Sequence, residues 1–288
     1  MSANASVVCT ARSWLFVPGN RPDRFSKALK AGADAVVIDL EDAVADADKD
    51  EARDVVVRTI EQGVLDGSVF LRLNALGSPF GSRDLAELAR LGSLDGLSGV
   101  LLPKVEHADQ VAAFRDRMGG HLPVVAIVET AQGLARVNSI AQADGVSRLV
   151  SGNLDLAEDL GCDFDTPGVR GHVEFPIVLA SRVAGLPPPV EGPETQLGEP
   201  TVVEAAARAA RALGFGAKIC IHPSQVDAVH RGLRPPEGEL ARARRVLAAV
   251  GSAAPGRAIK VDGRMVDKPV IEWAKRIVQS TGENLDHI

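Results

Sequence analysis

Two short stretches in the middle of the chain, Val124-Val125-Ala126-Ile127-Val128-Glu129 and Arg148-Leu149-Val150-Ser151-Gly152-Asn153-Leu154-Asp155, decide how the fold is interpreted. Each stretch contains a short β-branched apolar run flanked by polar residues, a pattern typical of a fully buried strand. A carboxylate follows each run almost at once, Glu129 in the first and Asp155 in the second. Mg²⁺ in proteins usually takes one or two carboxylates and leaves its remaining positions to water and substrate. The residues also fit an ordinary helix N-cap and a first-turn acid, so both interpretations stay open at this point.

The length and composition fit a soluble protein built on one α/β barrel. A chain of 288 residues is usual for one closed α/β barrel, and a hydrophobic fraction of 45% supports a large core. The net charge of −6 comes without a compensating basic tract, which argues against a general nucleic-acid binder.

The cysteines and the apolar runs bear on the cellular compartment. Cys9, Cys162 and Cys220 are widely separated and odd in number, which indicates reduced thiols and neither a disulfide framework nor a zinc site. No apolar run approaches about 18 residues, and the start of the chain lacks the pattern of a signal peptide. We therefore expect a cytoplasmic protein with no membrane partner.

Strand-like runs alternate with helical segments along most of the chain. Such alternation implies right-handed βαβ units and a parallel sheet buried on both faces. An open doubly wound sheet is disfavoured because no Gly-rich dinucleotide turn follows the first run, so the sequence predicts a (β/α)8 TIM barrel. The predicted strands are Trp14–Val17, Ala33–Leu40, Val69–Leu73, Gly99–Leu102, Val124–Val128, Leu149–Ser151, Pro189–Val190 and Ala217–Ile221, and the clearest helices are Arg24–Ala31, Lys49–Gln62, Ser82–Leu91 and Ala108–Arg117.

Polar residues follow most of the predicted strands at the same end. In a barrel the active site lies at the carboxyl ends of the strands, so these residues are candidates for one site. Any one of them would be ordinary in a solvated loop, but Arg72 and Lys104 directly follow short apolar runs. Together they predict a site that is suited to Mg²⁺ and an anionic substrate. The candidates are Glu41 and Asp42, Arg72 and Asn74, Lys104, Glu129, Asn153 and Asp155, Glu191, and His222.

The end of the chain is predicted to form an extension of the barrel. We place the catalytic barrel in residues 1–250 and the extension in residues 251–288, joined by a flexible connection from Gly251 to Gly256. The extension contains a strand-like run at Ile259–Val261, a turn at Asp262-Gly263, and a helix at Val270–Val278. Because a closed barrel has no need of this piece, we expect it to pack across a barrel mouth or on a neighbouring subunit.

The order of its motifs identifies what the chain resembles. It resembles the citrate lyase β-subunit-like proteins of the HpcH/HpaI aldolase superfamily, relatives of malyl-CoA and citramalyl-CoA lyases, from about Arg12 to Pro269. The motifs are RSWLFVPGNRPDRFSKA, GADAVVIDLEDAV, the R-L-N of Arg72 to Asn74, LLPKVE, AIVETAQGL, SGNLDLAEDLG, GFGAKICIHPSQ and GRMVDKP.

The resemblance implies roles for particular residues. Glu129 and Asp155 match the family's Mg²⁺ ligands, and Arg72 matches the arginine that grips the carboxylate of the keto acid or hydroxy acid. Glu41 and Asp42 match the acidic pair near the metal, where we expect them to hold metal-bound waters and orient neighbours. The substrate side would be completed by Arg12, the Pro18–Arg21 loop and backbone N–H groups of Gly152, Asn153 and Leu154. Lys104 fits a substrate contact or an ion-pair partner of Glu41 or Glu129 equally well.

Three further residues carry specific expectations. Asp267 lies in a G-x-M-x-D-x-P stretch that delivers a catalytic carboxylate to the neighbouring subunit in malyl-CoA lyase relatives, although a turn Asp before Pro269 is the ordinary alternative. Glu191 stands where many relatives have Asp, which we expect to alter the pocket for the acyl acceptor. For His222 we favour a loop-fixing hydrogen bond over acid–base chemistry.

The predicted function is that of a lyase. It would cleave a 3-hydroxyacyl-CoA of malyl, citramalyl or citryl type into an acyl-CoA and a keto acid, with Mg²⁺ and a reversible Claisen-type reaction. The resemblance also suggests a homo-oligomer, a trimer or a hexamer. Three alternatives are a citrate lyase complex subunit acting on an acyl-carrier-protein thioester, a metal-dependent pyruvate aldolase on a non-CoA substrate, and a barrel that binds metabolites without catalysis. The intact Glu129, Asp155 and Arg72 count against the last.

Overall fold

The chain divides into two compact units. The computed structural model describes residues 3–65, 68–91, 94–120, 122–166, 168–251 and 259–283. The first unit is Met1–Leu233 and the second is Arg234–Ile288. The division therefore falls between residues 233 and 234, whereas the sequence analysis placed it after residue 250. The predicted connection lies outside the described residues from residue 252 onward.

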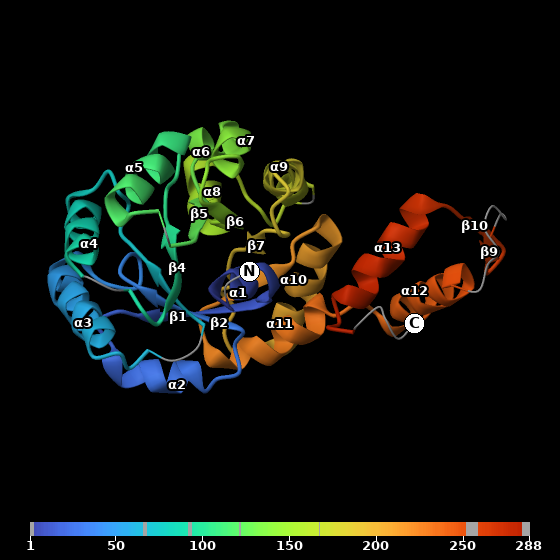
Figure 1. The fold of residues 1–288 in the computed structure, drawn as a ribbon, viewed down its shortest axis with the longest axis horizontal. Coiled ribbons are helices and arrows are strands. Elements are labelled where there is room, and N and C mark those ends of the chain that lie inside the picture. The colour runs from blue at the N-terminus through green and yellow to red at the C-terminus, as the bar shows by residue number, and fades with distance from the viewer. Residues whose placement is uncertain are drawn as a thin grey trace. The chain divides into compact units, whose positions relative to one another are not determined.

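The first unit is a closed barrel of parallel strands in chain order, β1 pairing with β8 to complete the ring (Figure 1). This confirms the predicted (β/α)8 fold. Seven of the eight strands lie within a few residues of their predicted bounds and β5 matches them at both ends. The strands are β1 Ser13–Pro18, β2 Ala35–Asp39, β3 Val69–Arg72, β4 Leu97–Leu102, β5 Val124–Val128, β6 Val146–Ser151, β7 Val190–Glu191 and β8 Ala217–Cys220.

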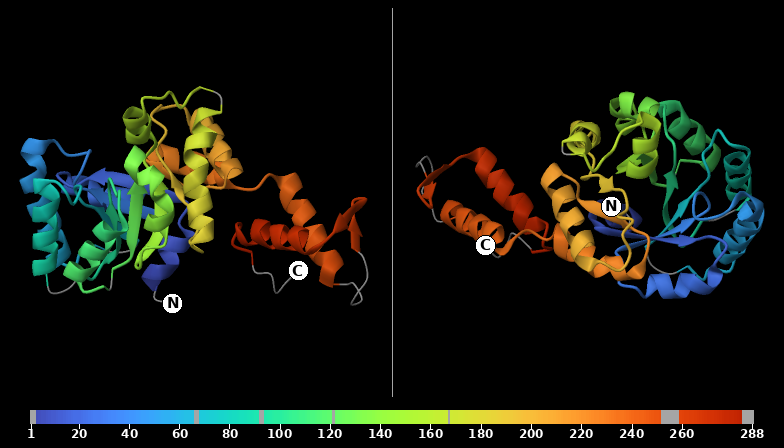
Figure 2. Two further views of the ribbon diagram at one scale, coloured as in Figure 1. Left: turned by 90° about the horizontal axis from the view of Figure 1, so that it is seen from above. Right: turned by 180° about the vertical axis from the view of Figure 1, so that it is seen from behind.

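Helices surround this ring of strands, as the views in Figure 2 also show. The four predicted helices are present, with the first split into a 3-10 turn, η1, and a short α2. The helical elements of the first unit are α1 Ala3–Thr10, η1 Pro22–Arg24, α2 Phe25–Leu29, η2 Asp46–Asp48, α3 Lys49–Glu61, α4 Pro79–Arg90, α5 Ala108–Met118, α6 Ala131–Ala135, α7 Val137–Ala141, α8 Asn153–Leu160, α9 Val169–Val183, α10 Pro200–Leu213, η3 Pro223–Gln225 and α11 Val226–Leu233.

Strand alternation produces two hydrophobic layers. On β5, Val125 and Ile127 belong to the cluster that fills the barrel, whereas Val124, Ala126 and Val128 belong to the cluster between the strands and helices. Both faces of each strand are therefore buried, which is why the strands read as continuous apolar runs. This alternation also fixes which side chains can reach the barrel interior.

The amino-terminal end of the barrel is closed by α1. Val8 packs into the interior cluster, and the buried Arg148 donates hydrogen bonds to the carbonyl oxygens of Val8 at 2.9 Å and Ala11 at 2.8 Å. Arg148 is 1% exposed, and this burial lowers its pKa to about 10. With this end closed, the opposite end of the barrel is the one available to a substrate.

The second unit has its own core. It contains α12 Glu237–Gly251, an antiparallel hairpin of β9 Ile259–Val261 and β10 Arg264–Val266, and α13 Lys268–Gln279. The predicted strand, turn and helix are all present, and Asp262 takes the left-handed conformation with φ 51° that such a tight turn requires. The sequence did not suggest that α12 belongs to this unit; it does because its buried residues pack in one cluster with those of α13.

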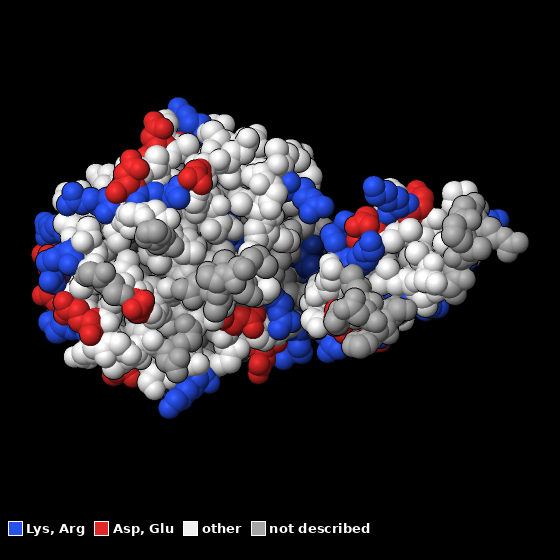
Figure 3. Space-filling model, in the orientation of Figure 1, with Lys and Arg blue, Asp and Glu red and all other residues white. Residues whose placement is uncertain are grey.

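Two surface features complete the description. Among the described residues, no helix is both long and apolar enough to span a bilayer. On the face drawn in Figure 3, lysines and arginines lie interspersed with aspartates and glutamates around the edge of the barrel unit.

Candidate active site

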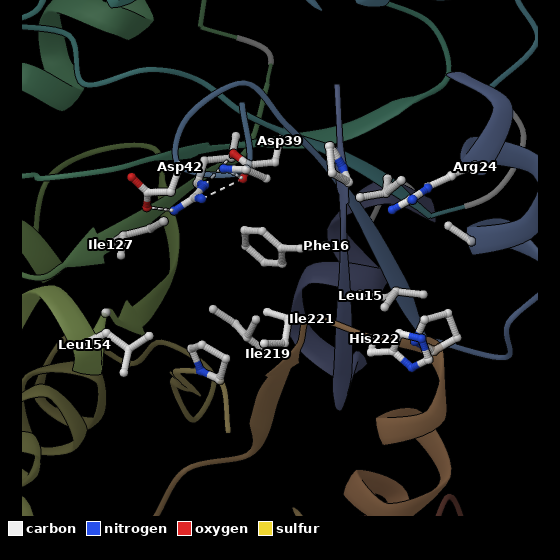
Figure 4. A pocket seen from close by; sticks show the side chains of 18 of the residues that line it. Leu15, Phe16, Arg24, Asp39, Asp42, Ile127, Leu154, Ile219, Ile221 and His222 are labelled. Atoms are coloured by element: carbon white, nitrogen blue, oxygen red, sulfur yellow. Dashed lines mark hydrogen bonds and ion pairs between the residues drawn. The ribbon is translucent and has the colours of Figure 1, made fainter. Parts of the chain in front are cut away.

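A cavity of about 740 Å³ lies at the carboxyl ends of the barrel strands. Its walls come from residues at the ends of β1, β2, β3, β5, β6 and β8, which is where a barrel enzyme assembles its site. Figure 4 shows Asp39 and Asp42 on one side, Arg24 and His222 on the other, and Phe16 between them. The cavity therefore has an acidic end, a cationic end and an apolar middle.

Arg72 is held at the acidic end by a buried carboxylate. It is the last residue of β3 and donates hydrogen bonds from Nε to Asp39 Oδ1 at 2.7 Å and from Nη2 to Asp39 Oδ2 at 2.6 Å. Asp39 is fully buried at the end of β2, the neighbouring strand. Its oxygens also accept hydrogen bonds from the backbone N–H groups of Glu41 and Ala43. Asp39 thus fixes both the guanidinium and the loop that carries Glu41.

The remaining side of Arg72 meets two more acids. Nη1 lies 3.0 Å from Asp42 Oδ2 and 3.0 Å from Glu41 Oε2. Burial disfavours the charged guanidinium, but the attraction of Asp39, Glu41 and Asp42 outweighs it and raises the pKa of Arg72. The ring of Phe16 lies 5.1 Å below the guanidinium carbon, a cation–π contact. Arg72 is therefore a permanent, oriented cation in the cavity wall.

A second network behind the wall holds the β2 loop. Lys49 Nζ donates to the carbonyl oxygens of Leu40 and Glu41 and to Asn74 Oδ1. Asn74 in turn donates from its side chain to Asp84 at 2.7 Å. Asn74, a candidate from the sequence, therefore supports the site from behind and is not part of the cavity lining.

Glu129 is brought against β4 and β6 by the two loops beside it. Its Oε1 accepts a hydrogen bond of 2.8 Å from the backbone N–H of Lys104. On the other side is Gly152, where a Cβ atom would lie 2.4 Å from Glu129 Oε2. Only glycine leaves room for Glu129 at that position, which explains the glycine in the β6–α8 turn.

The ammonium group of Lys104 lies between two further carboxylates. Its Nζ is 2.9 Å from Glu41 Oε1 and 3.1 Å from Asp155 Oδ2. Burial raises the pKa of Glu129 to about 8, with the charges of Glu41 and Asp155 adding to the effect. Burial also raises the pKa of Glu41, against the attraction of Arg72. The acidic end thus has more carboxylates than cations to neutralise them.

This donor set fits a divalent cation. Glu129 and Asp155 both line the cavity, and their carboxylates would offer two hard oxygen ligands, a number that Mg²⁺ usually takes from a protein. The buried Oε2 of Glu41 makes no hydrogen bond, although it lies in the ion pair with Arg72. Within the described residues no three acids, histidines or cysteines form a ready cluster of metal ligands. Lys104 Nζ lies between Glu41 and Asp155.

The start of α8 forms the neighbouring wall. Gly152, Asn153 and Leu154, whose N–H groups the resemblance places near a substrate carboxylate, all line the cavity. The N–H of Gly152 is already bonded to the carbonyl oxygen of Val128 at 3.1 Å. The N–H groups of the first helical turn have no partner within the helix, so those of Asn153 and Leu154 suit an anion better than that of Gly152.

The structure does not bring Arg12 to this cavity. Arg12 precedes β1, and its N–H and guanidinium contact Asp34, which precedes β2, at 2.7 and 3.5 Å. Both residues therefore lie at the amino-terminal end of the barrel. Of the predicted Pro18–Arg21 loop, Pro18 is the last residue of β1 and lines the cavity, whereas Arg21 pairs with Asp23 on the surface.

Glu191 does not line the cavity, and Asp267 belongs to the second unit. Glu191 is fully buried, points out of the barrel from β7, and pairs with Lys218 of β8 and with Arg170 of α9. It was expected to alter the pocket for the acyl acceptor, but it does not line the cavity. Asp267 belongs to the second unit, where its carboxylate caps α13 by accepting a hydrogen bond of 3.2 Å from the N–H of Val270.

Sequence reasoning missed Asp39, Arg24 and Lys27. An acid at the end of the apolar run of β2 was the available signal for Asp39, since a buried charge requires a partner. Arg24 and Lys27 lie at the cationic end of the cavity. His222 Nδ1 contacts Ser224 Oγ at 2.7 Å and caps η3, in agreement with the loop-fixing role favoured for it.

A closed parallel barrel with an acidic, arginine-containing cavity at the carboxyl ends of its strands has the architecture of a barrel enzyme for anionic substrates. Comparison with known proteins narrows this class. The chain belongs to the HpcH/HpaI aldolase/citrate lyase family, whose model matches residues 12–223, and it is a lyase of that family.

Relatives extend over almost the whole chain. A citrate lyase subunit beta-like protein of Mycobacterium tuberculosis is 38% identical over 277 residues, covering 94% of this chain and 95% of its own. An L-malyl-CoA/beta-methylmalyl-CoA lyase of Cereibacter sphaeroides is 34% identical, with 93% of each chain covered. The crystal structure of the CitE protein of Mycobacterium tuberculosis, in complex with magnesium, acetoacetate and coenzyme A, superimposes with a TM-score of 0.81 at 36% identity, covering 96% of this chain and 100% of that one.

Proposed function

We propose that this protein is a Mg²⁺-dependent carbon–carbon lyase that cleaves a 3-hydroxyacyl-CoA into an acyl-CoA and a keto acid by a reversible Claisen-type reaction. The observation that carries the proposal is the two-ended cavity, acidic around Arg72 and cationic at Arg24 and Lys27. The similar CitE structure with magnesium, acetoacetate and coenzyme A, and the malyl-CoA lyase relative, support the same chemistry.

The acidic end is suited to the bond-breaking part of the substrate. Glu129 and Asp155 would hold Mg²⁺, which supplies a Lewis acid and a template for the carboxylate and hydroxyl of the hydroxy acid. Arg72 offers a fixed positive charge to the same carboxylate. Asp42 is its most exposed partner, at 55% side-chain exposure, so a substrate carboxylate can take the place of Asp42 at Nη1. Glu41 and Asp42 are then available to orient water or neighbouring groups.

The other end is suited to a phosphorylated carrier. Arg24 and Lys27 are exposed on η1 and α2 and present two cations at the cavity wall. Leu15, Phe16 and Ile219 separate them from Arg72 with apolar surface. A long thioester arm that ends in phosphates matches this sequence of environments better than a short keto acid by itself, which favours a CoA-type thioester over a non-CoA aldol substrate.

Carbon–carbon cleavage leaves an enolate that must receive a proton. We assign the donor as Asp267, delivered from the second unit of a neighbouring subunit in a homo-oligomer, a trimer or a hexamer. Its support is the G-x-M-x-D-x-P match and its position at the start of α13, where the carboxylate is 3.2 Å from its only described hydrogen-bond donor. A purely structural Asp would make the same cap, and Asp267→Asn distinguishes the two roles because it keeps the cap and removes the carboxylate.

The experiment is a substrate screen on the purified chain. Malyl-, citramalyl- and citryl-CoA are incubated with the protein and Mg²⁺, and the acyl-CoA products are identified by mass spectrometry. We expect one or more to be cleaved without any other protein, and Glu129→Gln to abolish the product. Cleavage only of an acyl-carrier-protein thioester in the presence of other citrate lyase subunits would identify a complex subunit, and no turnover of any thioester would overturn the proposal.

A further inference from the structure

We propose that Lys104 is an internal counter-ion of the acidic site, which occupies Asp155 while the metal is absent and gives it up when Mg²⁺ binds. The inference rests on the proposed function, because it assumes that Glu129 and Asp155 bind the metal. It assigns Lys104 a positioning role in metal loading, separate from contact with substrate.

The first observation is the backbone of Lys104. It has φ 51°, a left-handed conformation that is uncommon and unfavourable for residues other than glycine. Within the described residues, Asp262 in the turn of the β9–β10 hairpin is the other non-glycine residue with positive φ. Lys104 has no such hairpin to explain it. A strained conformation of this kind persists where surrounding contacts require it.

The contacts show what the conformation achieves. With this backbone, the N–H of Lys104 donates to Glu129 Oε1 at 2.8 Å, and its Nζ lies 2.9 Å from Glu41 Oε1 and 3.1 Å from Asp155 Oδ2. One residue therefore contacts three carboxylates that come from the ends of β2, β5 and β6. Arg72 also contacts Glu41, with Nη1 3.0 Å from Oε2, but it is shared with Asp39 and Asp42.

The burial of Glu41 and Asp155 indicates which of the two ion pairs of Lys104 breaks when a metal binds. The Glu41 side chain is 8% exposed, whereas those of Asp155 and Lys104 are 36% and 37% exposed. Asp155 and the ammonium group can therefore separate into the cavity, while Glu41 is fixed. Mg²⁺ and the Lys104 ammonium compete for the carboxylate of Asp155. When Mg²⁺ binds Asp155, the ammonium can still form its ion pair with Glu41.

The competing explanation is that Lys104 binds only substrate. In that case its removal would leave Mg²⁺ affinity in the absence of substrate unchanged. Competition for Asp155 predicts the opposite, since removing the ammonium leaves a carboxylate pair that binds a dication more tightly. A charge-assisted contact of this kind changes a binding constant by about tenfold or more.

The test is titration calorimetry of Mg²⁺ into the metal-free full-length protein, without substrate. Lys104→Met removes the charge and keeps the side-chain length. Lys104→Gly also removes it but relieves the left-handed backbone, so it keeps the experiment informative if the Met variant does not fold. Lys27→Met is the matched control, because it removes the charge of a different lysine, one that lines the cavity from α2. Melting temperatures with and without Mg²⁺ provide a second readout.

We expect both Lys104 variants to bind Mg²⁺ about tenfold more tightly than the wild type, and Lys27→Met to change the affinity less than threefold. We also expect the Lys104 variants to gain more melting temperature from Mg²⁺ than the wild type does. A wild-type protein that binds Mg²⁺ while the Lys104 variants bind it equally or more weakly overturns this inference alone. A wild type that does not bind Mg²⁺ at all overturns the proposed function as well.

Discussion

Arg72 and Asp39 form a two-point ion pair, with Nε and Nη2 of the arginine 2.7 and 2.6 Å from the two carboxylate oxygens of the aspartate. The guanidinium edge that best matches a carboxylate is therefore already taken by the protein. A substrate carboxylate can reach Arg72 from the Nη1 side, where Asp42 lies at 3.0 Å with a half-exposed side chain. Asp39 orients the arginine, and a substrate carboxylate would displace Asp42 from Nη1.

The first prediction concerns this arginine. Arg72→Lys keeps the charge but loses the planar fork that Asp39 and a substrate share, so pyruvate binding in the presence of Mg²⁺ should weaken by roughly 1–3 kcal/mol. Titration calorimetry measures this. As a control, Asp42→Asn leaves the Asp39 pair intact and should bind pyruvate at least as tightly as the wild type. Equal weakening of pyruvate and of acetyl-CoA alone by Arg72→Lys would remove Arg72 from carboxylate binding.

The second prediction concerns the metal. Glu129→Ala and Asp155→Ala should each lower turnover by about 10²-fold or more while the far-UV circular dichroism stays unchanged, because the metal contributes several kcal/mol to transition-state stabilisation. EDTA should inactivate the wild type, and added Mg²⁺ should restore it. Glu158→Gln is the matched control, since Glu158 is an exposed acid on the same helix as Asp155. Turnover that survives thorough chelation contradicts the metal role.

The third prediction concerns a buried charge cluster behind β6–β8. Glu174 of α9 accepts a hydrogen bond from Ser151 Oγ at 2.9 Å and lies among Arg170, Glu191 and Lys218. Burial, reinforced by the charge of Glu191, raises the pKa of Glu174 to about 7. The folded state therefore binds one more proton than the unfolded state between the two pKa values, so stability should fall as pH rises from about 4.5 to about 7.

The matching measurement is urea unfolding of the wild type and of Glu174→Gln at pH 5 and pH 7.5. Because other acids also titrate, the informative quantity is the difference between the two proteins. The wild type should lose up to roughly 3 kcal/mol more than the variant over this range. Parallel pH dependence in both proteins would show that Glu174 keeps an ordinary pKa.

The fourth prediction concerns Asp267, which caps α13. Asp267→Ala removes both the cap and the carboxylate, so it should lower stability by about 1 kcal/mol and also abolish activity. Asp267→Asn preserves a good N-cap and removes only the carboxylate, so it should keep stability and still lose activity. If both variants stay active, Asp267 is a helix cap and no more.

Sharing of the site between subunits has a separate measurement. Asp267→Ala and Glu129→Ala, each inactive alone, are unfolded together and reassembled. Mixed oligomers should regain part of the wild-type turnover, since some sites then contain both intact groups. The absence of recovery from mixed oligomers, verified by mass spectrometry, would place Asp267 outside a shared site.

The sequence by itself determined the barrel and most of its active end. Strands that are buried on both faces must be apolar throughout, so runs such as Val124–Val128 were readable without any tertiary contact. Parallel strands in a closed ring place all their carboxyl ends together. The residues at or just after the strand ends, among them Arg72 and Glu129, could therefore be assigned to one site from their positions in the chain.

Tertiary structure alone decided the partners and directions of the side chains. The pair Asp39–Arg72 joins residues 33 positions apart, and the sequence does not specify which acid an arginine meets. Glu191 follows its predicted strand in the same way as Glu129, but in the structure it is the last residue of β7 and points out of the barrel, because side chains alternate between the two faces of a strand. Lys104 reaches three carboxylates only through a left-handed backbone that no local pattern predicts. Charge and periodicity are properties of the chain, whereas these contacts depend on register and on the packing of elements distant in sequence.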